Sequence, residues 1–139
     1  MLIMLDSSKK AFVFKIANMF RRFGLTSDVR LFIASQFALE SDYGSSRVCR
    51  NLSNYCGMKI PVSRITTCLD GVSSLATFAS YASLSECVED YALYLAYFRI
   101  TPVERCDVVK FAEFLKRNKY CPSSDYVDRI FKIYNQFNS

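Results

Sequence analysis

Apolar residues recur at the three- and four-residue spacing of an amphipathic helix along most of this chain, and this periodicity is the strongest constraint on its fold. Only 4 Gly and 3 Pro occur among the 139 residues, so few positions interrupt a helix. We expect helices or helical turns over residues 9–23, 27–40, 45–50, 83–98, 102–118 and 124–137. The chain is too short for two cores, so we expect one domain over residues 1–139.

Polar residues and proline predict where several of these helices begin and end. Ser83 and Glu86 have the spacing of a capping box at the start of the fourth stretch. Thr101 and Glu104 repeat that spacing around Pro102, which predicts a helix with proline at its first position. Other expected signals are the stop at Gly24 and the caps at Ser27 or Asp28 and at Ser123 or Ser124.

The segment from residue 51 to residue 77 breaks the helical pattern. It is rich in Ser and Thr, contains Pro61, and includes the β-branched run Ile65-Thr66-Thr67, which favours extended structure. Asp70-Gly71 has the composition of a tight hairpin turn. We therefore expect an α+β fold that is mainly α, with a helical lobe and a small irregular β lobe.

The charge and the apolar pattern limit the partners of the chain. The net charge of +5 suits an anionic partner such as a bacterial wall, and it is equally typical of a charge that serves only solubility. The basic residues are scattered rather than clustered, so we expect no nucleic-acid partner. The apolar stretches are short and interrupted by charge, which predicts no membrane span. The first six residues have no basic leader and do not resemble a signal peptide, so we expect export by another route.

The absence of histidine is the most restrictive chemical feature of the sequence. Without it, Ser–His and Cys–His nucleophile systems and most metal sites are excluded. The six cysteines include no Cys-x-x-Cys pair, so we expect no metal and no cofactor. Reduced thiols are the default for these cysteines, although the sequence leaves disulfides open. No glycine-rich phosphate loop is present either, which leaves carboxylate chemistry.

Glu40 is the carboxylate best placed for such chemistry. It lies at the end of an expected buried helix, just before the irregular lobe, where exclusion of solvent would raise its pKa. A glutamic acid of this kind can protonate a glycosidic oxygen, assisted by a second group across a cleft. From position alone, a solvated helix end followed by Ser-Asp-Tyr-Gly is the alternative interpretation.

Four short motifs follow one another along the chain. Residues 34–46 read ASQFALESDYGSS and are similar to the pattern AQ-x-A-L-E-S-G-W/Y-G-x-S. Residues 54–59, NYCGMK, are similar to N-x-F-G-I-K, and residues 78–81, FASY, to the start of F-R-x-Y-x-S. Residues 120–126, YCPSSDY, are similar to Y-A-T-D-P-x-Y. Together they resemble the bacterial glucosaminidases of glycoside hydrolase family 73, the mannosyl-glycoprotein endo-beta-N-acetylglucosaminidase-like domains of flagellar muramidases and autolysins.

This resemblance implies a lysozyme-like fold and an endo-beta-N-acetylglucosaminidase. Such an enzyme cleaves the β-1,4 bond after N-acetylglucosamine in the glycan strands of peptidoglycan. Glu40 matches the general acid of the family, and Tyr120 matches a cleft tyrosine near the reacting sugar. The positions that match substrate-binding or cleft-framing residues are Tyr43, Asn54, Gly57 and Tyr81, the last of which could instead pack behind the cleft.

The chain departs from the family pattern at several positions. Ala79 replaces the Arg of F-R-x-Y, and Cys56 replaces the Phe of N-x-F-G. Asp42 replaces a Gly, and it would raise the pKa of the general acid if the two carboxylates faced each other. Cys68 stands where relatives often carry a second carboxylate, which leaves Asp70 as the candidate from the lobe. Alternatively, the 2-acetamido group of the substrate would act as an internal nucleophile.

These observations predict a peptidoglycan hydrolase that acts on the bacterial cell wall. One alternative is a non-catalytic wall-binding or structural virion domain that keeps the fold. Another is a muramidase or lytic transglycosylase of the same fold. A compact unit without a leader or wall-binding repeats is typical of a bacteriophage endolysin or virion-associated hydrolase. It is also typical of a bacterial domain that virion or secretion-apparatus partner proteins carry out of the cell.

Overall fold

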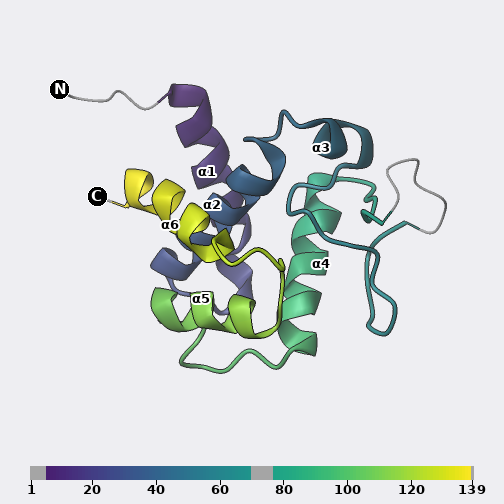
Figure 1. Cartoon of the computed structure of the whole chain (residues 1–139). Helices are drawn as coiled ribbons and strands as arrows, with labels where there is room; N and C mark the ends of the chain where they lie inside the picture. The colour runs from purple at the N-terminus through teal and green to yellow at the C-terminus, as the bar shows by residue number, and fades with distance from the viewer. Residues whose placement is uncertain (1–5, 70–76, 139) are drawn as a thin grey trace.

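The computed structural model describes residues 6–69 and 77–138 and is mainly helical (Figure 1). The helices are α1 (Ser7–Met19), the 3-10 helix η1 (Arg21–Phe23), α2 (Ser27–Ser41), α3 (Arg47–Leu52), α4 (Leu84–Tyr97), α5 (Val108–Arg117) and α6 (Tyr126–Phe137). The expected helices before and after an irregular middle segment are thereby confirmed. In the described part of the chain, no helix is long and apolar enough to cross a membrane.

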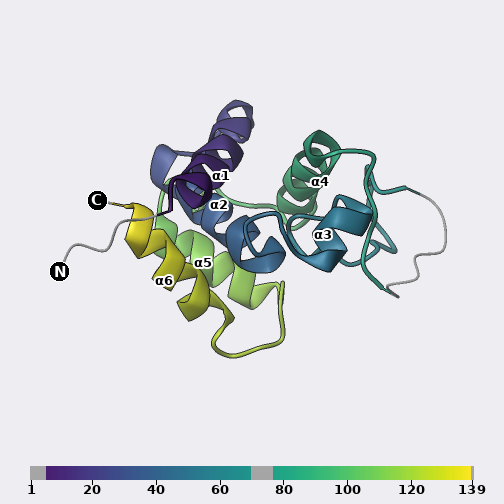
Figure 2. The ribbon, with the colours of Figure 1, turned by 90° about the horizontal axis from the view of Figure 1, so that it is seen from above.

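Helix α2 is the centre of the helical lobe. Residues 31–38 are all buried, so this part of the helix has no solvent-facing side. Figures 1 and 2 show α1, α5 and α6 gathered around α2, with α3 and α4 on the other side. The ring of Phe37 packs against that of Tyr91 in α4, with 5.3 Å between the ring centroids. The ring of Phe32 packs against that of Phe131 in α6, with 4.8 Å between the centroids. Aromatic burial of this kind fixes the position of α2 against both of its neighbours.

Two of the expected helix signals are confirmed. Gly24 adopts a φ of +72° and ends the first helical stretch, although α1 itself stops at Met19 and a 3-10 turn continues to Phe23. The Ser83 hydroxyl accepts a hydrogen bond of 3.2 Å from the backbone N–H of Glu86. The chain therefore enters α4 at the predicted residue.

The expected start of α5 at proline is wrong. Thr101 and Glu104 exchange the predicted side-chain-to-backbone hydrogen bonds, at 2.9 and 3.2 Å, but the residues between them form only turns. The Asp107 side chain accepts a backbone hydrogen bond of 3.0 Å from the third residue of the helix, so α5 begins at Val108. A stronger cap further along the chain thus sets this boundary.

The expected caps of the last helix are also wrong. Helix α6 begins at Tyr126, directly after Asp125, and the Asp125 side chain makes no capping hydrogen bond. Its carboxylate instead accepts from the Ser123 hydroxyl and lies 3.4 Å from the Arg129 guanidinium. The Asp125 carboxylate is thus bonded to side chains and not to the backbone of the first turn.

The expected β lobe is wrong for the described residues. Within residues 53–83, the described part of the chain forms no strand. It contains one isolated antiparallel bridge, between Lys59 and Phe78. The backbone groups are paired singly instead, as in the hydrogen bond of 2.9 Å from Ala79 N to the Met58 carbonyl. The expected hairpin at Asp70-Gly71 lies outside the described residues.

A buried carboxylate on α4 organises this segment in place of a β ladder. Asp90 is fully buried and receives two hydrogen bonds from Arg64, at 2.7 and 3.1 Å, and one of 2.7 Å from Thr66. The Tyr81 hydroxyl donates to its second oxygen. Burial opposes ionisation of Asp90, but these donors outweigh it, so the pKa of the carboxyl is lowered. The irregular segment is thus fixed to α4 through side chains, which the hydrophobic pattern cannot reveal.

Candidate active site

Glu40 lies in the last turn of α2, where the chain leaves the helical lobe. The helix ends at Ser41, and Asp42 follows in the left-handed conformation with a φ of +49°. The Ser41 hydroxyl donates to the Phe37 carbonyl at 2.7 Å and accepts from Gly44 N at 2.9 Å. These bonds fix the turn after Glu40, so the carboxyl group projects from a rigid base.

A chain of buried hydrogen bonds ends on the Glu40 carboxylate. Gln36 lies one helical turn before Glu40 and is fully buried. Its Oε1 accepts from the Tyr91 hydroxyl at 2.5 Å, and its Nε2 donates to the Tyr126 hydroxyl at 2.9 Å. The Tyr126 hydroxyl in turn donates to Glu40 Oε2 at 2.9 Å.

This chain has a fixed direction, because an amide nitrogen can only donate. The Tyr126 oxygen accepts from Gln36, so its own hydrogen points to Oε2 of Glu40. An acidic proton on Glu40 is therefore carried by Oε1. The network thus selects which oxygen can donate a proton.

Gly57 lies directly against the Glu40 carboxyl group. A Cβ atom built on Gly57 would be 2.6 Å from Glu40 Oε2 and 2.8 Å from its Cδ, closer than real Cβ contacts. Gly57 also has a φ of +72°, a conformation that side chains rarely adopt. Both the space and the backbone at this position therefore require glycine.

Asn54 holds the loop that presents Gly57. Its side chain is buried, and its Nδ2 donates to the carbonyls of Met58 and Ala79 at 2.9 and 2.8 Å. Its Oδ1 accepts from the backbone N–H groups of Cys56, Gly57 and Met58 at 3.3, 2.9 and 3.2 Å. One amide side chain thus fixes the loop that carries Gly57.

The environment favours the protonated form of Glu40. Burial raises the pKa of its carboxyl group above the ordinary 4.5. The Tyr126 hydrogen bond and the charges of Arg129 and Lys59 oppose this shift without cancelling it. Asp42 has no part in it, because its exposed side chain accepts from the Ser45 hydroxyl within the turn. The structure therefore makes Asp42 a turn residue.

Tyr120 packs against Tyr126, the residue that is bonded to the Glu40 carboxyl group. Its hydroxyl donates to the Cys56 carbonyl at 2.7 Å, and its ring lies parallel to that of Tyr126, with 6.0 Å between the centroids. Burial raises the pKa of Tyr120 well above its ordinary value, so the hydroxyl stays protonated. Tyr120 therefore links the Gly57 loop to the start of α6.

Two other predicted positions lie away from Glu40. The Tyr43 ring packs edge-on against Phe12 of α1 at 6.1 Å, with the Lys9 ammonium 4.9 Å from its centroid. Tyr81 is 3% exposed, and its hydroxyl is bonded to Asp90. Tyr81 thus packs behind the loop, which was the second interpretation of this position.

The positions that depart from the family pattern have definite surroundings. Ala79 is fully buried next to the Gly57 loop, and Asp90 forms its ion pair with Arg64. Cys56 is buried, with its sulfur 3.6 Å from that of Cys87. All six cysteines are free thiols, and no group of metal-ligating side chains occurs in the described ranges. Asp70, the predicted second carboxylate, lies outside the described residues.

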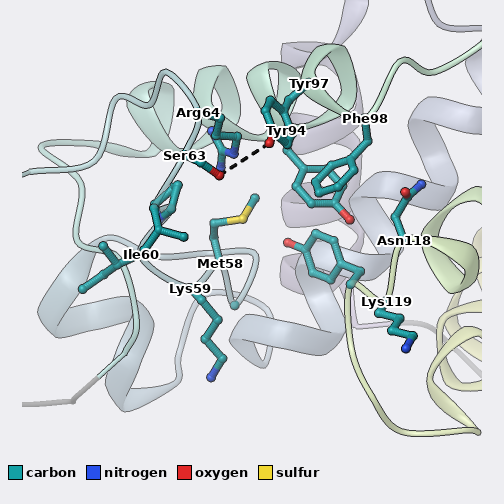
Figure 3. A pocket seen from close by; sticks show the side chains of 14 residues that line it. Met58, Lys59, Ile60, Ser63, Arg64, Tyr94, Tyr97, Phe98, Asn118 and Lys119 are labelled. Carbon is teal, nitrogen blue, oxygen red and sulfur yellow. Dashed lines mark hydrogen bonds between the residues drawn. The ribbon is translucent and has the colours of Figure 1, made fainter.

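A cavity of about 270 Å³ opens beside Gly57 (Figure 3). Its walls are formed by residues 57–64, by residues 118–120, and by aromatic side chains near the end of α4. Glu40 does not line it, but Gly57, which touches Glu40, and Tyr120, which stacks on Tyr126, both do. The cavity and the carboxyl group are therefore both next to the Gly57 loop.

Three residues of this site, Gln36, Tyr91 and Tyr126, were not predicted from the sequence. A signal was present for Gln36, which precedes Glu40 by four residues and so lies on the same face of a helix whose other positions are mostly apolar. A polar side chain in such a place needs a buried partner. No local pattern identifies Tyr91 and Tyr126 as those partners, because they come from α4 and α6.

Comparison with known proteins gives a family and two similar structures. The family model described as Glucosaminidase: Mannosyl-glycoprotein endo-beta-N-acetylglucosaminidase matches residues 17–139. One similar structure is a type VI secretion system effector–immunity complex from Pseudomonas protegens, with a TM-score of 0.66 and 20% identity over 95% of each chain. Another is the catalytic domain of the autolysin Auto from Listeria monocytogenes, with a TM-score of 0.65 and 19% identity over 99% of this chain and 88% of that chain. No curated protein matches the sequence.

Proposed function

The chain belongs to the mannosyl-glycoprotein endo-beta-N-acetylglucosaminidase family, and from this membership we propose that it is a peptidoglycan hydrolase with Glu40 as its general acid. The bond cleaved is the β-1,4 bond after N-acetylglucosamine. The observation that carries the proposal is the partly buried Glu40 carboxyl group, whose pKa is raised by burial and whose Oε2 is already bonded to Tyr126.

In this mechanism Glu40 donates its proton from Oε1 to the glycosidic oxygen as the bond to the anomeric carbon breaks. The Tyr126 hydroxyl and the charges of Arg129 and Lys59, which favour the carboxylate, stabilise the group after the proton has left. Tyr120 and Gly57 shape the side of the cleft next to the reacting sugar.

A second group must stabilise the positive charge that develops on the sugar. Asp70 and the 2-acetamido group of the substrate are the two candidates. An Asp70→Asn variant distinguishes them through the rate of glycan cleavage. A loss of about 10²-fold or more would assign the role to Asp70, and a nearly unchanged rate would assign it to the substrate.

The bond specificity is tested by mass spectrometry of digested peptidoglycan. A glucosaminidase leaves N-acetylglucosamine at the new reducing ends. Products that end in N-acetylmuramic acid would indicate a muramidase, and 1,6-anhydro ends would indicate a lytic transglycosylase. Binding to cell walls without release of new reducing or 1,6-anhydro ends would favour the non-catalytic alternative.

The similar structures also bear on delivery. One of them is a chain of a type VI secretion system effector–immunity complex, which supports a protein partner and an export route through a secretion apparatus for this chain. The other is an autolysin catalytic domain. Neither comes from a bacteriophage, so the endolysin hypothesis gains no support from them.

Removal of the Tyr126 hydroxyl is expected to change the pH dependence of hydrolysis. In a Tyr126→Phe variant Glu40 loses the hydrogen bond that lowers its pKa, so the pKa rises further. Because a general acid must be protonated, the alkaline limb of the pH–rate profile moves to higher pH. Unfolding becomes about 1–3 kcal/mol easier, since Gln36 Nε2 loses its buried acceptor.

A Tyr134→Phe variant is the matched control, because Tyr134 lies on the same helix with no part in the hydrogen-bond network. The alkaline limb of the pH–rate profile of this control variant should coincide with that of the wild type. An unchanged limb in Tyr126→Phe as well would show that the hydroxyl does not act on the reacting carboxyl group.

A further inference from the structure

The cavity beside Gly57 is not used by the proton transfer proposed above. Its lining is unusually apolar for an open surface: Ile60, Val62, Tyr97 and Phe98 are 42%, 97%, 48% and 36% exposed. Apolar side chains exposed together around a concavity are typical of a binding site. Figure 3 shows the aromatic residues of α4 facing Met58 and Ile60 across the cavity.

The Tyr94 hydroxyl is a buried polar group without a hydrogen-bond partner in the described structure. Tyr94 is only 7% exposed. Its ring packs between those of Phe98 and Tyr120, with centroid distances of 4.6 and 5.2 Å. Burial raises the pKa of Tyr94 to about 12, so the Tyr94 hydroxyl is uncharged at neutral pH. Because buried polar groups are nearly always paired, this hydroxyl marks a place where a bound molecule would supply the missing partner.

The charges around the cavity all have the same sign. Its lining residues include Lys59, Arg64 and Lys119, and no carboxylate of the described chain is among them. Arg64 is neutralised by Asp90, whereas Lys59 and Lys119 form no ion pair with a described residue. Figure 3 shows these two lysines on opposite walls. A ligand that complements this cavity therefore carries carboxylates.

We propose that this cavity binds the short acidic peptide attached to the glycan strand, so that the protein recognises peptide-bearing peptidoglycan rather than bare glycan. This inference rests on the proposed function. The amino sugars of the strand are uncharged where the peptide is attached, so the peptide carboxylates are the natural partners of Lys59 and Lys119. The apolar walls suit alanine methyl groups, and the Tyr94 hydroxyl suits a peptide carbonyl.

The position of the cavity agrees with this assignment. Gly57 lies against Glu40 and is also one of the residues that line the cavity. A group bound there is adjacent to the reacting bond without occupying its place. The peptide branches from the sugar next to the cleaved bond, so it can reach the cavity while the strand passes Glu40.

The test compares kcat/KM on intact peptidoglycan and on glycan strands that an amidase has stripped of peptide and whose exposed lactyl carboxylates have then been converted to simple amides. The wild type should prefer the intact substrate, and Lys119→Gln should reduce that preference by about tenfold, the effect of losing one charge-assisted hydrogen bond. Turnover of stripped strands should not change in this variant. Lys15→Gln, an exposed lysine on α1, is the matched control and should keep the full preference.

A Tyr94→Phe variant separates a ligand-binding role from a structural one. The hydroxyl has no partner in the described part of the protein, so its removal should leave the melting temperature unchanged or raise it, while the preference for intact peptidoglycan falls. Equal turnover of the two substrates by the wild type would overturn the peptide site but leave the proposed function intact. If neither substrate is cleaved, calorimetry with the isolated acidic peptide decides. Binding that depends on Lys119 supports the site, and no binding overturns it.

Discussion

A Glu40→Gln variant is expected to lose about 10²- to 10⁴-fold in the rate of peptidoglycan cleavage, the range that a general acid contributes. The amide has the shape of the carboxylic acid and can still accept the Tyr126 hydrogen bond on one side. It has no acidic proton to give to the leaving oxygen. The rate is measured as reducing ends released from purified cell walls, and circular dichroism checks that the fold is kept.

Asp42→Asn provides the matched control for this variant. Asp42 lies two residues away, is exposed, and is bonded within its own turn. Loss of its charge should leave the rate within about twofold of the wild type, since a surface charge contributes little. If Glu40→Gln retained more than a tenth of the wild-type rate, Glu40 would not be the proton donor.

The same substitution has a defined effect on stability as the pH changes. The folded pKa of Glu40 lies above its unfolded value of 4.5, so the folded state binds the proton more tightly. The contribution of this proton to the free energy of unfolding is fully present below pH 4.5 and is lost as the pH rises through the folded pKa of Glu40. The wild type should therefore lose stability relative to Glu40→Gln as the pH rises above 4.5, as measured by urea unfolding.

Gly57→Ala is expected to reduce activity by about 10²-fold, comparable to the effect of displacing a catalytic group by 1 Å. The new methyl group would lie 2.6 Å from Glu40 Oε2, so either the loop or the carboxyl group must move. Movement of the carboxyl breaks the alignment with Tyr126, and movement of the loop disturbs the bonds to Asn54. Steady-state hydrolysis and thermal unfolding would measure the two effects.

Gly24→Ala controls for backbone strain alone. Gly24 has the same φ of +72°, but a Cβ there would meet only the Arg105 side chain at an ordinary 3.7 Å. Both variants should lose about 1–2 kcal/mol of stability from the left-handed conformation. Only Gly57→Ala should lose activity. Equal activity in the two variants would mean that the contact between Gly57 and Glu40 has no catalytic importance.

The helical lobe was largely predictable because its signals are local. The apolar spacing gave helices at nearly the positions observed, and Gly24 and Ser83 marked two of their ends. The boundary near Pro102 was wrong because the competing cap at Asp107 cannot be ranked against it from sequence. The irregular segment was expected to hold loops with a short hairpin because its β-branched residues suggested strands, whereas the side chain of Asp90 organises the described part of it.

The candidate site was predictable in part. Glu40 was selected by its position at a helix end and by the motif around it, and the structure places Gly57 and the Asn54 loop against it. The hydrogen-bond chain through Gln36, Tyr91 and Tyr126 was not predicted, because it joins three helices far apart in sequence. The cavity beside Gly57 was not predicted either, because the sequence does not show whether the Tyr94 hydroxyl has a hydrogen-bond partner.

The pKa of the Glu40 carboxyl group itself tests the proposed proton donor most directly. It can be measured by ¹³C NMR of side-chain carboxyl resonances across a pH titration, with the Glu40→Gln variant identifying the signal. We expect a resonance that titrates above 4.5 in the wild type and is missing from the variant. A Glu40 carboxyl that titrates at or below 4.5 would contradict the claim that this fold holds a partly buried acid ready to donate its proton.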